Sequence, residues 1–147
     1  MPKFSKRSKQ RLYTCDADLI VLFEEVVKVY DCTIIQGYRG KALQNRYFSE
    51  GKSKLRYPDS KHNSTDDEGK PCSLAVDVAP YPVDFKDLKR YHHFAGFVLA
   101  TYHYLVKTGE CYSGWRLRWG GNWSEKLADM KTNRFEDLGH FEMVPDK

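Results

Sequence analysis

Two helical patterns, separated by short strand-like runs, constrain the fold of this 147-residue chain more than any other feature. The longer one covers residues 84–107, where apolar residues recur roughly one helical turn apart and Gly109 follows the end. The shorter one covers residues 16–30, with Thr14 or Asp16 available as the N-cap. An amphipathic helix needs another element to cover its apolar face, so both helices are expected to pack on a sheet.

The strands of that sheet are short. The candidate strands are residues 32–36, 73–79, 116–119 and 140–144. A third helix is expected at residues 40–51, closed by glycine, and the polar residues 52–71 are typical of a loop. This order predicts an α+β fold, a small and mostly antiparallel sheet with helices packed on it. No repeat or linker divides the chain, so residues 1–147 are expected to form a single domain.

Composition excludes several classes of protein. Hydrophobic residues make up 41% and charged residues 30%, which fits neither a disordered chain nor a membrane protein. The longest apolar stretches are too short to span a bilayer, and no apolar segment of the kind found in signal peptides follows the basic start. No pair of cysteines has C-x-x-C spacing, so we expect free thiols at all four, which are Cys15, Cys32, Cys72 and Cys111.

The net charge is +4, and much of the excess lies in residues 1–11. One interpretation is a solvated, partly frayed and flexible N-terminus. The other is attraction to a polyanion, either nucleic acid or an anionic cell envelope. Composition does not choose between these interpretations.

Three polar clusters lie in or beside the expected strands, where apolar residues would be typical. Ser60-Lys61-His62 ends the polar loop, and Asp77 interrupts the strand-like run of residues 73–79. Residues 137–142, with the sequence DLGHFE, lead into the last strand. Polar residues at such positions indicate a functional site.

The three clusters contain the donors that a catalytic zinc ion needs. Such an ion takes three ligands from His nitrogens and carboxylate oxygens and keeps a fourth position for water. His62, Asp77 and His140 supply two imidazoles and one carboxylate. Asp137 lies three residues before His140, where it can accept the proton of a water whose pKa the metal has lowered to roughly 7. The sequence therefore predicts a zinc site with Asp137 as its base.

The order of these motifs resembles that of the zinc DD-/LD-peptidases, which include D-alanyl-D-alanine carboxypeptidases and dipeptidases and the phage L-alanyl-D-glutamate endolysins. Their Ser-x-His, x-Ala-x-Asp and acid-x-x-His motifs correspond here to residues 60–62, 74–77 and 137–140. Residues 35–39 (IQGYR) and 118–123 (RWGGNW) resemble further segments of the phage endolysins. The resemblance covers about residues 35–143 and implies a hedgehog/DD-peptidase-like fold.

The resemblance also implies a role for each matching residue. The two histidines and the aspartate named above would bind Zn²⁺, and Asp137 would act as general base and then protonate the leaving amine. Arg39 would hold the developing oxyanion or a substrate carboxylate. Ser60 would hydrogen-bond the substrate, and Glu142 would accept the N–H of a ligand histidine.

The sequence departs from the family pattern in three places. His62 and Asp77 are fifteen residues apart, farther than is usual in the family, because residues 63–72 carry an acidic insertion. Ser73 stands where glycine is usual, and Asn122 stands where the endolysins often have aspartate. Lengthening a loop costs little free energy, so we expect the insertion to bulge outward without moving either ligand.

These features predict a zinc-dependent hydrolase of peptidoglycan that cuts an L-Ala–D-Glu or a D-Ala–D-Ala type bond. We expect a monomer that acts on the stem peptide, with no nucleic acid or membrane as partner. Without a signal peptide, it would accumulate in the cytoplasm of a phage-infected host before release to the cell wall. The alternatives are a catalytically silent zinc-binding module or virion-associated domain, and a nucleic-acid binder, which would leave the polar clusters without a reason.

Overall fold

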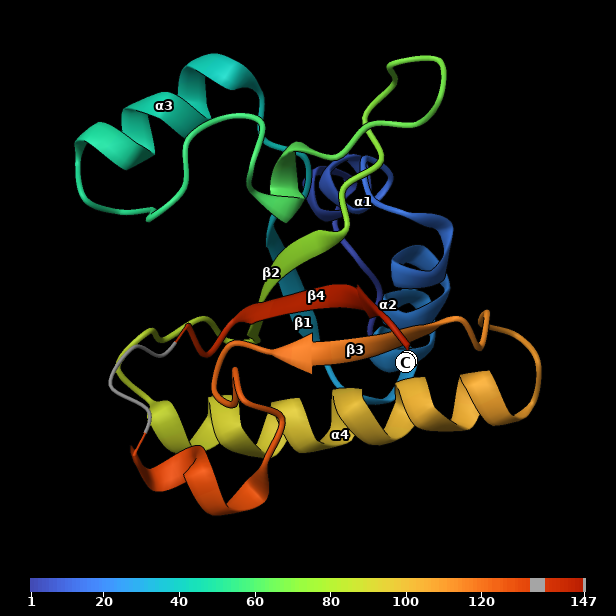
Figure 1. Ribbon diagram of the computed structural model, residues 1–147. Helices are drawn as coiled ribbons and strands as arrows, with labels where there is room; N and C mark the ends of the chain where they lie inside the picture. Colours follow the sequence, from blue (N-terminus) through green and yellow to red (C-terminus); the bar gives the residue numbers. More distant parts are fainter. Residues whose placement is uncertain (133–136, 147) are drawn as a thin grey trace.

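Four strands form one sheet in the order β1-β2-β4-β3, and every neighbouring pair is antiparallel (Figure 1). The strands are β1 (Cys32–Gln36), β2 (Ala75–Pro80), β3 (Trp115–Trp119) and β4 (His140–Pro145). The computed structural model describes residues 1–132 and 137–146. The sheet and its helices confirm the predicted α+β class.

Two long helices cover one face of this sheet (Figure 1). The helices are α1 (Lys6–Leu12), α2 (Ala17–Val29), α3 (Lys41–Ser49) and α4 (Leu88–Lys107), with short 3₁₀ helices η1 (Lys61–Asn63) and η2 (Leu127–Thr132). Phe141 of β4 is fully buried between α2 and α4, with its ring centroid 5.7 Å from that of Phe23 and 6.2 Å from that of Phe94. The main core therefore lies between the sheet and these two helices.

The opposite face of the sheet carries the polar residues. Successive side chains of a strand point to opposite faces, so Phe141 faces the core while His140 and Glu142 face away from it. Residues directly opposite each other on neighbouring strands share a face. His140 is opposite Asp77, and Glu142 is opposite Arg118. The strand register thus assembles a polar cluster from three strands.

Part of the basic N-terminal segment forms helix α1. Ser5 caps the helix by accepting a hydrogen bond from the backbone N–H of Ser8. The Ser8 hydroxyl accepts from Ile34 N at 3.1 Å, and Arg11 Nη1 donates to Ile34 O at 3.1 Å. Leu12 is fully buried. These contacts fasten α1 to β1, and they involve polar side chains that apolar periodicity does not reveal.

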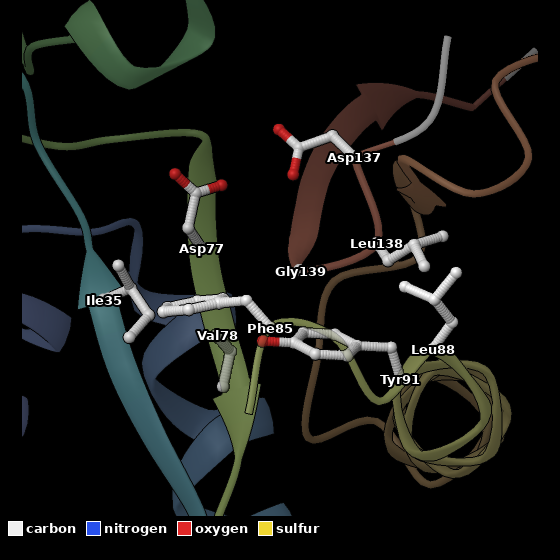
Figure 2. A pocket seen from close by; sticks show the side chains of 9 residues that line it. All are labelled: Ile35, Asp77, Val78, Phe85, Leu88, Tyr91, Asp137, Leu138 and Gly139. Atoms are coloured by element: carbon white, nitrogen blue, oxygen red, sulfur yellow. The ribbon is translucent and has the colours of Figure 1, made fainter. Parts of the chain in front are cut away.

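Helix α4 begins at Leu88, four residues later than the sequence pattern predicted. Asp87 is the N-cap and accepts from Arg90 N, and the Asp84 carboxylate accepts a backbone N–H two residues on. Such short acidic side chains offer the backbone an alternative to the helix. Phe85, expected on the apolar face of the helix, instead precedes it, remains 67% exposed and lines a pocket (Figure 2).

The insertion between the first two predicted ligands folds as a small hairpin. Cys72 N donates to Ser64 O at 3.0 Å, and Thr65 pairs with Pro71. At the tip, the Asp66 carboxylate accepts two backbone N–H groups. Figure 1 shows this loop projecting away from the sheet, as expected from the sequence.

Two expectations drawn from composition can be compared with the structure. All four cysteines are free, as predicted, and burial raises the pKa of Cys15, Cys32 and Cys111 to about 12. These thiols are therefore poor nucleophiles. Among the helices of residues 1–132 and 137–146, none combines the length and apolar character needed to cross a membrane.

Candidate metal centre

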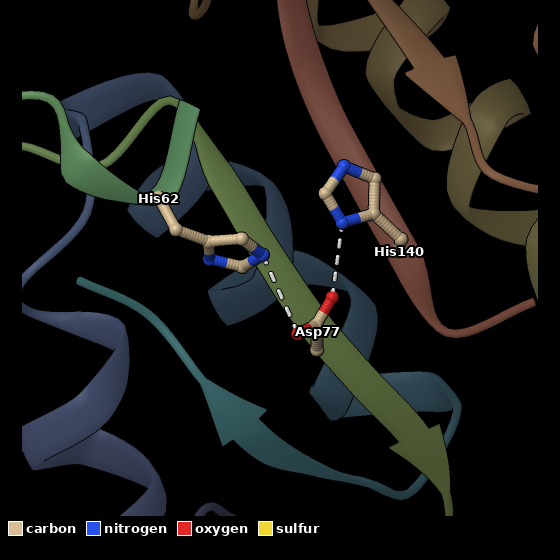
Figure 3. A group of neighbouring side chains, drawn as sticks. All are labelled: His62, Asp77 and His140. Carbon is tan, nitrogen blue, oxygen red and sulfur yellow. Dashed lines mark hydrogen bonds and ion pairs between the residues drawn. The ribbon is translucent and has the colours of Figure 1, made fainter. Parts of the chain in front are cut away.

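Three side chains that are distant in the sequence meet above the polar face of the sheet (Figure 3). His62 comes from η1, Asp77 from the middle of β2 and His140 from the start of β4. His62 Nε2 lies 3.4 Å from Asp77 Oδ2, and His140 Nδ1 lies 3.1 Å from Asp77 Oδ1. One donor atom from each residue lies within 4.8 Å of the others. The structure thus brings together the predicted ligand set.

Backbone groups fix the orientation of His62. Its Nδ1 lies 2.8 Å from the carbonyl oxygen of Gly37, so Nδ1–H donates there and Nε2 is left to face Asp77. Gly37 is required because an added Cβ would lie only 2.3 Å from Arg11 O. Ser60 lines the space beside His62, and its hydroxyl accepts from His62 N at 3.2 Å, which caps η1.

A carboxylate fixes the orientation of His140. Its Nε2 lies 2.8 Å from Glu142 Oε1, the hydrogen bond that the family resemblance implied, so Nδ1 is left to face Asp77. The second oxygen of Glu142 accepts from Arg118 Nη2 at 2.6 Å. A carboxylate behind a ligand histidine holds its tautomer and raises its basicity. Arg118 was not assigned a role from sequence, although its position opposite Glu142 follows from the strand register.

The electrostatics of the cluster favour a cation among these donors. Burial alone would lower the pKa of His140, but its hydrogen bonds to Asp77 and Glu142 raise that pKa to about 9. Burial opposes ionisation of Asp77, yet the positive charge of His62 and hydrogen bonds from both histidines hold its pKa below the ordinary value. The cluster therefore stabilises positive charge next to an ionised carboxylate.

The same donor geometry suits a divalent metal ion. A tetrahedral zinc ion with ligand bonds of about 2.0–2.2 Å keeps its donor atoms roughly 3.3–3.6 Å apart. His140 Nδ1 is 3.1 Å from one oxygen of Asp77 and His62 Nε2 is 3.4 Å from the other, which is close to this spacing, and one donor atom from each residue lies within 4.8 Å of the others. Each histidine also turns one nitrogen toward the common point and uses the other for a hydrogen bond. The residues present fit a metal ion.

Asp137 lies beside the three donors. Its Oδ2 is 4.0 Å from His140 Nδ1, and its side chain is 50% exposed. Asp137 N donates to Gly120 O at 3.0 Å, and a Cβ at Gly120 would lie 2.1 Å from Asp137 O, so only glycine allows this approach. Removal of the Asp137 carboxylate from water raises its pKa, and the negative charge of the nearby Asp77 raises it further. The backbone thus holds a carboxylate next to the cluster.

Arg39 is buried on the other side of Asp77. Its Nε and Nη2 donate to Gln36 Oε1 at 3.0 and 2.7 Å, and its Nη1 donates to Gln44 Oε1 at 2.9 Å. Nη2 also lies 3.8 Å from Asp77 Oδ2. Burial lowers the pKa of Arg39, while the Asp77 carboxylate opposes that effect. Sequence reasoning gave neither glutamine a role of its own, although Gln36 lies in the IQGYR segment that resembles the phage endolysins.

Two pockets flank the cluster. One, of about 420 Å³, is here named the apolar pocket and is lined by Ile35, Val78, Phe85, Leu88, Tyr91 and Leu138, with Asp77 and Asp137 at one end (Figure 2). The other, of about 560 Å³, is here named the cationic pocket and is lined by Arg39, Lys52, Lys54, Lys61 and Arg118, together with Ser60, His62, Asp137 and His140. Ile35 reaches the apolar pocket from a β-bulge, where β1 shifts its register against β2. The candidate metal centre therefore lies at the junction of two differently charged spaces.

Comparison with known proteins places the chain in a family. The sequence profile described as "Phage L-alanyl-D-glutamate peptidase" matches residues 1–144. The L-alanyl-D-glutamate peptidase of Escherichia phage T5 is 28% identical over 150 residues, which cover 97% of this chain and 98% of that protein. The crystal structure of the Serratia marcescens L-Ala D-Glu endopeptidase ChiX has the same fold, with a TM-score of 0.65, 20% identity, and coverage of 97% of this chain and 90% of that chain. The chain therefore belongs to the phage L-alanyl-D-glutamate peptidase family.

Proposed function

We propose that the protein is a zinc-dependent peptidase that hydrolyses the L-alanyl–D-glutamate bond of peptidoglycan stem peptides. The observation that carries this proposal is the convergence of His62, Asp77 and His140 on one point, with Asp137 beside them. The phage T5 relative is named for this bond, and the two proteins match over almost their entire lengths. We choose the L-alanyl–D-glutamate bond over the D-Ala–D-Ala type because the family is named for the former.

Zinc is the metal that best suits the donor set. Two imidazole nitrogens and one carboxylate oxygen are the ligands of many catalytic zinc sites, which keep one position open. Zinc bound there would act as a Lewis acid that polarises the scissile carbonyl and makes water a stronger acid. The two pockets leave room for a peptide on either side of this point.

Asp137 is the proposed general base. Its carboxylate would accept the proton of the attacking water and then deliver that proton to the nitrogen of the leaving glutamate. Because Asp137 lines both pockets and lies next to His140, it is adjacent to wherever a bound peptide crosses between them. It is not one of the three metal donors, so it remains available for proton transfer.

Arg39 and Ser60 are proposed to act on the substrate. The guanidinium of Arg39 is held by two glutamines, so its charge stays fixed beside Asp77 and can stabilise the developing oxyanion. The Ser60 oxygen accepts a bond from His62 N, which leaves its O–H to donate to a peptide carbonyl in the cationic pocket.

We further propose that residues 1–147 act as one monomeric zinc peptidase domain. One continuous core links the helices to the sheet, which supports this view. The proposed site of action is the cell wall, reached from the cytoplasm of an infected host, with no nucleic acid or membrane as partner.

The test is the substitution Asp137→Ala. We expect turnover on purified peptidoglycan to fall by about 10²–10⁴-fold, the usual contribution of a general base, while zinc content stays near one equivalent. Asp67→Ala, an exposed acid in the insertion hairpin, is the matched control and should leave turnover unchanged. Identification of the newly freed amine as that of D-glutamate establishes the bond. Wild-type hydrolysis by Asp137→Ala would contradict the mechanism, and a protein that keeps zinc but cleaves nothing would be a silent binding module.

A further inference from the structure

The two pockets beside the metal centre differ sharply in charge. The cationic pocket has five Lys and Arg side chains against the carboxylates of Asp59, Asp137 and Glu142. The five cations outnumber the three carboxylates, so the pocket keeps an excess of positive charge. Among the residues that the structure describes, no Lys or Arg lines the apolar pocket, and its acids lie only at the end next to the candidate metal centre (Figure 2). A ligand that fills both pockets must therefore be anionic at one end and uncharged at the other.

Tyr91 places one polar group in the apolar pocket. Its side chain comes from α4, and Figure 2 shows the hydroxyl directed away from the helix, toward β2. The residue is only 4% exposed, and its hydroxyl has no hydrogen-bond partner among the described residues. A buried hydroxyl without a partner costs free energy, so its presence in a pocket next to a candidate active site points to a ligand that pairs with it.

The two halves of an alanyl–glutamate bond match this asymmetry. The alanyl side offers a methyl group and peptide amides, none of them charged. Glutamate has two carboxyl groups, and the peptide chain uses only one of them, so the glutamyl side keeps a free carboxylate. Lysine and arginine are the side chains that bind such an anion.

We propose that the substrate crosses the metal centre in one direction, with its alanyl side in the apolar pocket and its free glutamyl carboxylate in the cationic pocket. In this arrangement, the Tyr91 hydroxyl hydrogen-bonds an amide group of the alanyl side and acts as a substrate-positioning residue. This inference rests on the proposed function and adds the direction of binding. Asp137, which lines both pockets, then lies at the scissile bond.

The first test removes only the hydroxyl. Tyr91→Phe should raise KM and lower kcat/KM by about tenfold on an alanyl–glutamyl peptide, the effect of one lost hydrogen bond. Its melting temperature should not fall, because the hydroxyl has no partner within residues 1–132 and 137–146. Tyr104→Phe, on the same helix but exposed and outside both pockets, is the matched control. Unchanged kcat/KM, or a loss of stability in its place, would overturn the role of Tyr91.

The second test determines the direction of binding. Two peptides are compared that differ only in the free glutamyl group, a carboxylate in one and a carboxamide in the other. The wild-type zinc protein and Tyr91→Phe should both prefer the carboxylate, by about tenfold for a charge-assisted hydrogen bond. Lys54→Gln with Lys61→Gln should lose this preference. Lys28→Gln with Lys107→Gln makes the same charge change outside both pockets and should retain it. A preference that survives in the first lysine variant, or that disappears in Tyr91→Phe, would overturn the proposed direction.

The same peptides separate this inference from the proposed function. If the zinc-loaded wild type cleaves no alanyl–glutamyl peptide, the proposed function fails. Calorimetric binding of both peptides to zinc-loaded Asp137→Ala, which is expected not to turn them over, still measures the carboxylate preference in each background. If the peptides are cleaved, but the carboxylate preference survives in the Lys54→Gln, Lys61→Gln variant or disappears in Tyr91→Phe, the proposed function stands and only the direction of binding is rejected.

Discussion

The two faces of the four-stranded sheet are built from the same strands, but one face forms the hydrophobic core and the other forms the candidate site. On the face covered by α2 and α4, Phe141 is fully buried and contacts aromatic rings from both helices. On the other face, His140 and Glu142 form a chain of hydrogen bonds that continues to Arg118 and Asp77. Successive residues of β4 thus alternate between the hydrophobic core and the polar cluster. This difference shows that one strand register fixes both the core and the site. A shift of one residue in the pairing of β4 would turn each side chain to the other face and destroy both.

The sharpest test of this comparison substitutes adjacent residues of β4. His140→Ala removes a proposed ligand, so we expect turnover to fall by roughly a thousandfold or more while the fold is retained. Phe141→Ala leaves a cavity in the core, so we expect the free energy of unfolding to fall by about 3–5 kcal/mol. Peptidoglycan hydrolysis by the zinc-loaded variants, and urea unfolding of the chelated variants near pH 9, where the His140 proton no longer adds stability, separate the effects. Comparable destabilisation by both substitutions would break the division between the faces.

A second prediction concerns the polar face without its metal. The pKa of His140 in the folded protein is about 9, compared with an ordinary value of 6.5. The folded protein thus binds this proton more tightly than the unfolded chain, and the stabilisation is complete below pH 6.5 and is lost as the pH rises toward 9. We expect the chelated protein to lose on the order of 2–3 kcal/mol across this window.

Thermal melts at several pH values check this expectation. Saturating zinc should abolish the fall, because the metal takes the place of the proton between the donors. His140→Gln in chelator should lack this fall, since residue 140 then has no imidazole to titrate. A flat profile for the chelated wild type would show that the polar face does not hold the proton as the geometry indicates.

The smallest expected effect comes from the residue behind the ligand. Glu142→Gln keeps the size of the side chain but replaces a carboxylate with an amide, which weakens its hydrogen bond to His140. We expect metal affinity to fall by about 10–100-fold, without loss of the fold. Zinc titration against a competing chelator measures this affinity. Unchanged affinity would limit the functional part of the polar face to the residues that contact the metal.

Much of the fold could be predicted from apolar periodicity. Helix α2 and strand β1 follow from it directly, because their apolar residues face one core. Helix α1 was missed because polar contacts from Ser8 and Arg11 to Ile34 fasten it to the sheet. The start of α4 was misplaced because the Asp84 and Asp87 side chains compete for backbone N–H groups.

The candidate site was predictable in its donors but not in what surrounds them. The order of the three motifs pointed to His62, Asp77 and His140, which the structure places together. The burial of Arg39 by two glutamines depends on how α3 returns to the sheet, and no local pattern encodes that path. The pocket around Tyr91 likewise depends on where α4 begins.

The insertion hairpin has a consequence for how relatives of this protein are found. Its base is closed by the bond between Ser64 O and Cys72 N, and none of residues 64–72, all of which the structure describes, lines either pocket. The chain between the first two proposed metal donors, His62 and Asp77, can therefore lengthen while the distance between them stays the same. A search pattern with a fixed number of residues between the histidine and the aspartate would overlook relatives with such an insertion. A pattern that allows a hairpin of any length between them would retrieve these relatives. The same tip is a natural point for grafting a wall-targeting peptide onto the enzyme.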